Sequence, residues 1–206
     1  MEDQILALAE LRRDLLFEKI PRSQYDYYIE NAINIGKNAA KPFKDKKIKS
    51  LYKEFDITLS YSDKANMIMN FQLRAEFVKK KNKNEVVLYT KSLEALTAAW
   101  NQSNRCSNKV EQSDIEDVHL AHEFHHFLEY NIHSPVEKQL KPIEIPTLFG
   151  NRKKKYIKQC SEIACHAFAK ELTEFPYFPT ILDLVFLESK GELDAEIAKE
   201  VFELRV

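Results

Sequence analysis

Residues 114–130 read DIEDVHLAHEFHHFLEY, a helical pattern that no glycine or proline interrupts. Within it, His122 and His126 lie four residues apart, and Glu123 directly follows the first histidine. A spacing of four returns to the same face of an α-helix, so the two imidazole rings can converge on one metal ion with a carboxylate beside it. This H-E-x-x-H pattern predicts a long helix that carries a zinc site.

The residues around the motif predict how this helix starts and what it does. Ser113 or Asp114 is a suitable N-cap, because either side chain can accept hydrogen bonds from the backbone N–H groups of the first turn. Zinc lowers the pKa of a bound water from about 15.7 to roughly 7, and Glu123 can accept that water's proton as it attacks a carbonyl carbon. The predicted role of Glu123 is therefore that of a general base.

A catalytic zinc site normally takes three protein ligands and leaves the fourth position to water, so a third ligand is expected downstream. Residues 159–172 form a second helical stretch with an acid near its start and small residues on one face. Glu162 is the best candidate, and it would complete a His2Glu site with His166 as a supporting neighbour one turn further on. The alternative for Glu162 is an ordinary acid in the first turn of a helix.

Other metal-binding side chains have simpler explanations. Cys160 and Cys165 are five residues apart and Cys106 stands alone, whereas structural zinc sites use C-x2–4-C spacing. Buried cysteines on a packed helix are the commoner case. His119 is expected to pack or titrate at the surface. His133 falls at the start of a loop, where it could contact a substrate.

Two segments, HLAHEFHHFLE at residues 119–129 and SEIACHAFAKEL at residues 161–172, carry a family resemblance. Together they resemble the ImmA/IrrE family of metallopeptidases, in which an H-E-x-x-H helix is followed by an E-x-x-A-N-x-F-A-x-x-L-L-type helix. The resemblance implies a gluzincin-like, thermolysin-like zinc site. It assigns His122, His126 and Glu162 as metal ligands and Glu123 as the base.

The same resemblance implies a zinc metallo-endopeptidase that cuts a helix-turn-helix repressor of a mobile element or stress response. The chain departs from the family pattern at His125, where a small residue is usual, and at Cys165–His166, which replace an alanine–asparagine pair. The alternative function is a catalytically silent zinc-binding module that regulates a partner protein by docking. Glu123 favours the enzyme, because a docking module has no need for a base.

Length and composition predict one metallopeptidase domain over residues 1–206, since 206 residues with 44% hydrophobic content can bury a substantial core. A net charge of −1 gives no general attraction to nucleic acid or membranes, so neither is an expected partner. No apolar run approaches 18 residues, the start is acidic, and three irregularly spaced cysteines favour a reducing cytoplasm. The expected parts are N-terminal helices (1–50), a zincin-like core (51–180) and C-terminal helices (181–206).

Hydrophobic periodicity predicts an α+β fold that is mainly helical, with a small antiparallel sheet beside the motif helix. An edge strand of that sheet could hold an extended peptide substrate through main-chain hydrogen bonds. Helices are expected at 2–19, 23–40, 48–55, 180–189 and 192–204, and strands at 57–61, 73–78 and 85–89.

Several segments leave their roles open. Residues 131–150 contain three prolines and are expected to form a lid or binding loop near the metal. Residues 79–84 predict a polar hairpin tip, and the basic run Arg152–Lys155 favours a solvated helix start over a site for DNA or an acidic partner. A peptidase also needs a group that stabilises the tetrahedral oxygen. The candidates are Tyr130, His133, Tyr156, His166 and Tyr177.

Overall fold

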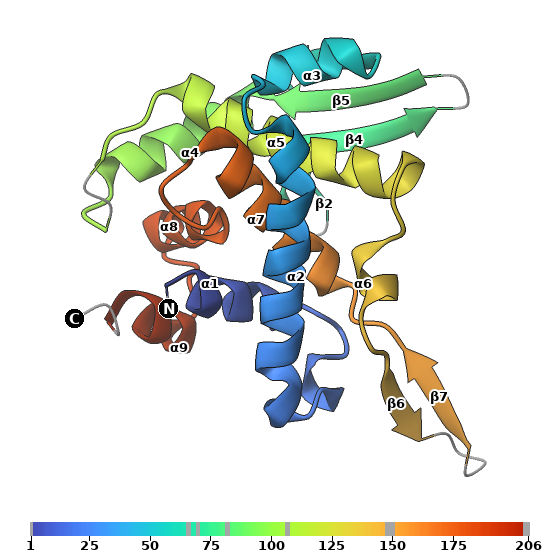
Figure 1. The fold of residues 1–206 in the computed structure, drawn as a ribbon. Coiled ribbons are helices and arrows are strands. Elements are labelled where there is room, and N and C mark those ends of the chain that lie inside the picture. The colour runs from blue at the N-terminus through green and yellow to red at the C-terminus, as the bar shows by residue number, and fades with distance from the viewer. Residues whose placement is uncertain are drawn as a thin grey trace.

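Helices make up most of the molecule, and a small sheet covers one end of it (Figure 1). The computed structural model describes residues 2–64, 67–68, 71–80, 83–105, 108–146 and 151–203. The mainly helical α+β class predicted from hydrophobic periodicity is confirmed. Among the described residues, no helix has the length and apolar character needed to cross a membrane.

The sheet has three strands in the order β1-β5-β4, and it is mixed. Strand β5 pairs antiparallel with β4, as predicted, but it pairs parallel with β1. Alternating apolar residues indicate a strand without indicating its direction, which explains why an all-antiparallel sheet was expected. The strands are β1 (Ile57–Ser62), β4 (Ala75–Lys80) and β5 (Lys83–Tyr89), and a short hairpin, β2 (Met67–Ile68) with β3 (Phe71–Gln72), lies between β1 and β4 in sequence.

The motif helix α5 (Gln112–Asn131) runs directly beneath the sheet in the view of Figure 1. It begins earlier than predicted, because its N-cap is Glu111 and not Ser113 or Asp114. The Glu111 side chain accepts from the backbone N–H of Asp114, and the Asp114 carboxylate accepts from the backbone N–H of Glu111 at 2.9 Å. Two carboxylates thus form a capping box, a role that Ser or Thr fills more often at the first position.

An aromatic cluster holds the other side of α5 in the core. Phe124 is fully buried, and its ring lies 5.2 Å from that of Phe55 and 5.4 Å from that of Phe43, both edge to face. The Tyr52 hydroxyl donates to the carbonyl of Leu120 at 2.8 Å, which ties α3 (Ile48–Glu54) to α5. Side chains on the opposite side of α5, among them His122 and His126, line a cleft.

Helix α7 (Gln159–Thr173) packs against both α5 and α2 (Tyr25–Ala40). Small residues let α2 approach α7 closely. A Cβ atom added to Gly36 would lie 2.1 Å from the carbonyl oxygen of Ala164. Glycine is therefore required where the two backbones touch.

Replacing Gly36 with Ala should lower the free energy of unfolding by about 3 kcal/mol, because the helix backbones must separate to admit the methyl group. Urea denaturation measures the change. The control is Asn34→Ala at an exposed position on the same helix, where higher helix propensity should leave stability unchanged or slightly raised. A Gly36→Ala protein as stable as the parent would contradict the close contact.

The N-terminal helix α1 (Glu2–Leu11) ends well before the predicted residue 19. The Asp14 carboxylate accepts from the backbone N–H groups of Leu16, at 2.8 Å, and Gln159, at 3.0 Å. This tertiary contact turns the chain away from a helical path. Three 3-10 turns occupy the flanks of α2: η1 (Phe17–Lys19), η2 (Arg22–Gln24) and η3 (Lys41–Phe43).

The C-terminal part differs from prediction in its details. Helix α8 (Thr180–Lys190) ends at Gly191, whose φ of 70° suits glycine. The next helix starts later than residue 192, because the Asp194 side chain caps it. It consists of α9 (Ala195–Ala198) and a π-helical turn, η4 (Lys199–Glu203). Hydrophobic periodicity did not predict α4 (Thr90–Gln102), which directly follows β5.

The segment expected to be a loop at 131–150 contains regular structure. It holds α6 (Val136–Gln139) and β6 (Ile143–Pro146), while the basic run forms β7 (Arg152–Lys155), a strand and not a helix start. Strands β6 and β7 pair as a hairpin that projects from the body (Figure 1). In an extended strand successive basic side chains point to opposite faces, which reduces their repulsion. Residues 147–150 and 81–82, and Cys106, lie outside the described part of the chain.

Candidate metal centre

Helices α5 and α7 bring together the three side chains that the sequence predicts as metal ligands. Nε2 of His122 lies 3.2 Å from Nε2 of His126. The Glu162 carboxylate lies 3.2 Å from the first of these nitrogens and 3.4 Å from the second. The two histidines come from successive turns of α5, and the carboxylate comes from the first turn of α7.

These separations fit a tetrahedral metal site. With bonds of about 2.0–2.1 Å from zinc to nitrogen or oxygen, tetrahedral ligand atoms lie roughly 3.3 Å apart. The separations of 3.2, 3.2 and 3.4 Å match that value, with Oε2 of Glu162 nearest to His122 and Oε1 nearest to His126. The three side chains therefore already lie at ligand spacing, and buried His, Glu and Cys groups of this region can hold a metal ion.

Glu162 is in the form that binds metals. Burial would raise the pKa of its carboxyl group, but hydrogen bonds from His122 and His126 hold that pKa well below its ordinary value. The group is thus a carboxylate at neutral pH. Its side chain is 35% exposed, which leaves the proposed metal position open toward the cleft.

Glu123 lies between the metal ligands and the edge of the sheet. Its side chain accepts a hydrogen bond of 2.8 Å from the backbone N–H of Phe77 in β4. The residue is 9% exposed and lines the same cleft as His122 and His126. The backbone of an edge strand therefore fixes the carboxylate beside the cleft.

Glu129 supports the second histidine from behind. Its carboxylate lies 3.3 Å from Nδ1 of His126, on the side of the ring away from the candidate ligand nitrogen. The same carboxylate accepts from the Ser161 hydroxyl at 2.5 Å and from the backbone N–H of Val136 at 2.8 Å. Hydrogen bonds from His125, His126, Ser161 and the Val136 backbone hold the pKa of Glu129 below its ordinary value against the opposing effect of burial.

Cys165 adds a sulfur atom to this region. Its thiol lies within reach of His122 and His126 as a possible third donor, and also of His125 and Glu129. However, Sγ is nearly equidistant from Nδ1 and Nε2 of His126, at 3.5 and 3.6 Å, so it faces the side of the ring and not the Nε2 lone pair. It also contacts Nδ1 of His125 at 3.1 Å. Burial raises the pKa of the Cys165 thiol, which favours its neutral form.

The candidate metal ligands open into a cleft of about 680 Å³ between β4 and the helices α1, α5, α7 and α8. Charged side chains from distant parts of the sequence form its far wall. Arg13 contacts Glu10 at 3.2 Å, and Arg74 contacts Asp183 at 3.1 Å. The sequence contained no signal for this wall, because its members come from α1, the turn before β4, and α8.

Two further histidines line the cleft as neutral rings. His119 is half-buried and packed beside the cleft, one of the two expectations for it, and burial lowers its pKa to about 4. Its Nδ1 contacts the carbonyl of Ile115 at 2.8 Å, so in the neutral ring Nε2 is an acceptor. Burial lowers the pKa of His166 to about 3. The sequence predicts that this ring supports Glu162. In the structure it lies edge to face against the ring of His122, with the ring centroids 4.9 Å apart.

The structure separates the five candidates for stabilising the tetrahedral oxygen. Tyr130 and His166 line the metal cleft. His133 lines a different cavity on the other side of α5, and Tyr156 lies under the ammonium group of Lys138. Tyr177 packs edge to face on Trp100. Only the first two of these described residues therefore remain candidates.

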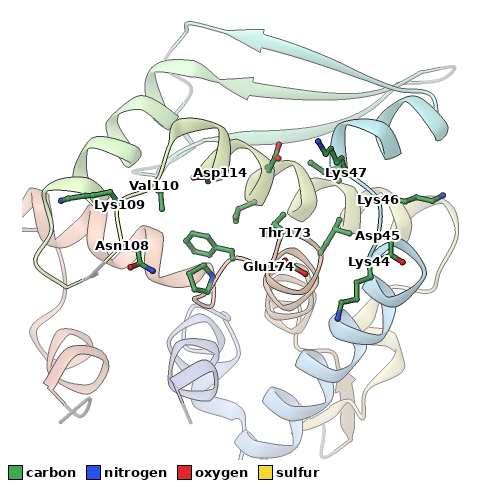
Figure 2. A pocket seen from close by; sticks show the side chains of 16 residues that line it. Lys44, Asp45, Lys46, Lys47, Asn108, Lys109, Val110, Asp114, Thr173 and Glu174 are labelled. Carbon is green, nitrogen blue, oxygen red and sulfur yellow. The ribbon is translucent and has the colours of Figure 1, made fainter.

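A second cleft, of about 720 Å³, lies between the residues before α3, the start of α5 and the end of α7 (Figure 2). It is lined by sixteen residues, none of them histidine or cysteine. Lys46 and Lys109 extend away from it on opposite sides in Figure 2. Acidic Asp45, Asp114, Asp117 and Glu174 lie among its lysines, so its charge is mixed. Among the described residues, the groups of side chains that could hold a metal ion lie elsewhere.

Comparison of the chain with protein-family models, curated proteins and solved structures finds no significant match. Its function must therefore be inferred from the geometry and chemistry of its own residues.

Proposed function

We propose that the chain is a zinc-dependent metallo-endopeptidase that hydrolyses a peptide bond in a protein substrate. The observation that carries the proposal is the triangle of donors from His122, His126 and Glu162, with its tetrahedral spacing, beside the Glu123 carboxylate. Each of these four side chains, taken alone, could have a purely structural role. Their convergence in one cleft next to a strand edge supports a catalytic site.

Zinc is the metal that this donor set favours. Two imidazole nitrogens and one carboxylate oxygen, with the fourth position open to a cleft, match the donors of catalytic zinc sites in peptidases. When bound, the metal supplies Lewis acidity that polarises a carbonyl group and makes water more acidic. Glu123 would accept the proton of that water, and His122, His126 and Glu162 would hold the metal.

The free edge of β4 offers a binding surface for an extended peptide. Tyr89 donates from its backbone N–H to the carbonyl of Arg74 at 2.9 Å, so Arg74 belongs to the set of β4 residues that bond to β5. In an antiparallel pair this bonding alternates. The main-chain groups of Ala75, Phe77 and Lys79 therefore face the opposite edge, toward the cleft.

The contact between Phe77 and Glu123 marks where chemistry would occur along that edge. A peptide added beside β4 would pair with main-chain groups on either side of Phe77, as in other cases of strand addition. Its central peptide bond would then lie near the Glu123 carboxylate and the proposed metal position. Extended backbone is required for such pairing, so the cleavage site should lie in a segment that can leave its secondary structure.

The proposed substrate is a helix-turn-helix repressor of a mobile element or stress response. This assignment rests on the resemblance of the two motif helices to ImmA/IrrE metallopeptidases. The chain would act in the cytoplasm, where such repressors are found. Two buried thiols, Cys160 and Cys165, both free, are compatible with a reducing compartment.

Incubation with purified helix-turn-helix repressors, starting with those encoded near the gene, tests this function. Mass spectrometry of the repressor should show two fragments that add up to its full length. Cleavage should stop when a chelator removes the metal and should return when zinc is restored, because water activation depends on the ion. Stoichiometric binding without cleavage by the zinc-loaded protein would instead support a docking module.

A further inference from the structure

The metal ligands are held by other side chains, and one of these has an unusually complete set of contacts. Glu129 lies on α5, three residues after His126, and is 7% exposed. Its carboxylate lies 3.3 Å from Nδ1 of His126 and 3.7 Å from Nδ1 of His125. It also accepts hydrogen bonds from the Ser161 hydroxyl and the Val136 backbone N–H.

The orientation of the His126 ring determines where its Nε2 lone pair points. When Nε2 binds a metal, the ring proton sits on Nδ1 and needs an acceptor. Two acceptors lie near Nδ1: the Glu129 carboxylate at 3.3 Å and the Cys165 sulfur at 3.5 Å. The carboxylate is the stronger acceptor, because it is charged and sulfur accepts hydrogen bonds weakly.

We propose that Glu129 is a positioning residue for the metal centre, which fixes the His126 ring by accepting the hydrogen bond from Nδ1–H. This inference rests on the metal centre of the proposed function, but it does not require peptidase activity. Glu129 itself is held by groups at the starts of two other helices, α6 and α7. A carboxylate anchored by these two hydrogen bonds can hold an imidazole ring that has two free rotations.

Val136 links the Glu129 carboxylate to the segment between α5 and the β6–β7 hairpin. This residue begins α6, directly after the chain leaves α5 and before it enters the β6–β7 hairpin. The bond of 2.8 Å from its N–H to Glu129 therefore attaches the connecting segment to the carboxylate that orients His126. Ser161 connects the same carboxylate to α7, one residue before the ligand candidate Glu162.

Zinc affinity, measured by competition with a chelator, tests the role of Glu129. The Glu129→Gln side chain keeps its size but loses its charge, and the zinc dissociation constant should rise by about 10- to 100-fold. Ser161→Ala removes one support of the carboxylate and leaves the His126 contact, so a smaller rise is expected. The matched control is Glu116→Gln, on the same helix, where the carboxylate pairs with Lys49 at 3.6 Å.

A spectroscopic signal separates positioning from a general loss of structure. In the zinc-loaded parent, NMR should show a slowly exchanging Nδ1–H proton of His126, and the Glu129→Gln protein should lose it. Loss of that signal together with weaker zinc binding supports the inference, with circular dichroism confirming the fold. If Glu129→Gln does not fold, absence of the protected proton in the parent is sufficient to overturn it.

The outcomes distinguish this inference from the proposed function. A dissociation constant within about twofold of the parent in Glu129→Gln, well below the effect of a lost metal-supporting contact, would overturn the positioning role and leave the metal centre in place. A parent that binds zinc with the protected proton but cleaves nothing would contradict the peptidase and retain the positioning role. A parent that binds no zinc would overturn both.

Discussion

Replacing Glu123 with Gln should lower the rate of substrate cleavage by about 10²-fold or more, the usual scale for the loss of an acid–base group. The change removes one negative charge and leaves the shape of the side chain intact. The amide can still accept the hydrogen bond that the backbone N–H of Phe77 donates at 2.8 Å, so the fold should survive. Zinc content should remain that of the parent, because Glu123 is not among the proposed ligands.

Cleavage of a repressor, followed by mass spectrometry at equal zinc occupancy, measures this effect. Glu116→Gln is the matched control, since it makes the same chemical change on the same helix outside the cleft. It should cleave at the parental rate. Unchanged cleavage in the Glu123→Gln protein would show that a different base, or a contaminating protease, does the work.

Replacing Glu162 with Ala should weaken zinc binding by more than about 100-fold, beyond the usual effect of removing a group that only supports a ligand. The carboxylate lies 3.2 and 3.4 Å from the two candidate nitrogens, and without it two histidines must hold the ion alone. Elemental analysis after dialysis against a weak chelator measures the loss. The Glu123→Gln protein should retain its zinc under the same conditions.

Glu171→Ala is the control for this variant. Glu171 lies on the same helix, α7, and its carboxylate pairs with Lys44 at 3.7 Å at the surface. Removing it should leave zinc content unchanged. Equal zinc content in the Glu162→Ala protein and the parent would remove Glu162 from the ligand set, and Cys165 would become the next candidate.

The sequence predicted the part of the site that depends on local geometry. His122 and His126 are brought together by one turn of helix, a relation that spacing alone defines. Glu162 was predicted because a catalytic zinc site needs a third protein ligand and this acid lies near the start of the next helical stretch. Glu129 could also have been predicted from helix spacing, because it lies three residues after His126 on the same helix.

Features that depend on tertiary contacts could not be read from spacing. Glu10 of α1, and Arg13 just after that helix, reach the cleft only because α1 packs on α7 and α8. The end of α1 depends on Asp14, whose carboxylate bonds to the distant backbone of Gln159. The parallel pairing of β1 with β5 depends on the path of the chain between them, and alternation along a strand carries no information about that path.

The metal cleft carries more acidic than basic side chains. Acidic Glu123 and Glu162 and the paired acids Glu10 and Asp183 outnumber the two arginines of the wall. A divalent cation would balance this excess, which gives the region a reason to bind metal beyond the geometry of its ligands.

The location of the metal is the central claim, and anomalous X-ray diffraction at the zinc absorption edge tests it most directly. Crystals grown from zinc-supplemented protein should show one peak per chain. It should lie about 2.0–2.2 Å from Nε2 of His122, Nε2 of His126 and an oxygen of Glu162, the distances of zinc to such ligands. The absence of any peak, or a peak between His125, Glu129 and Cys165 instead, would contradict the proposed site.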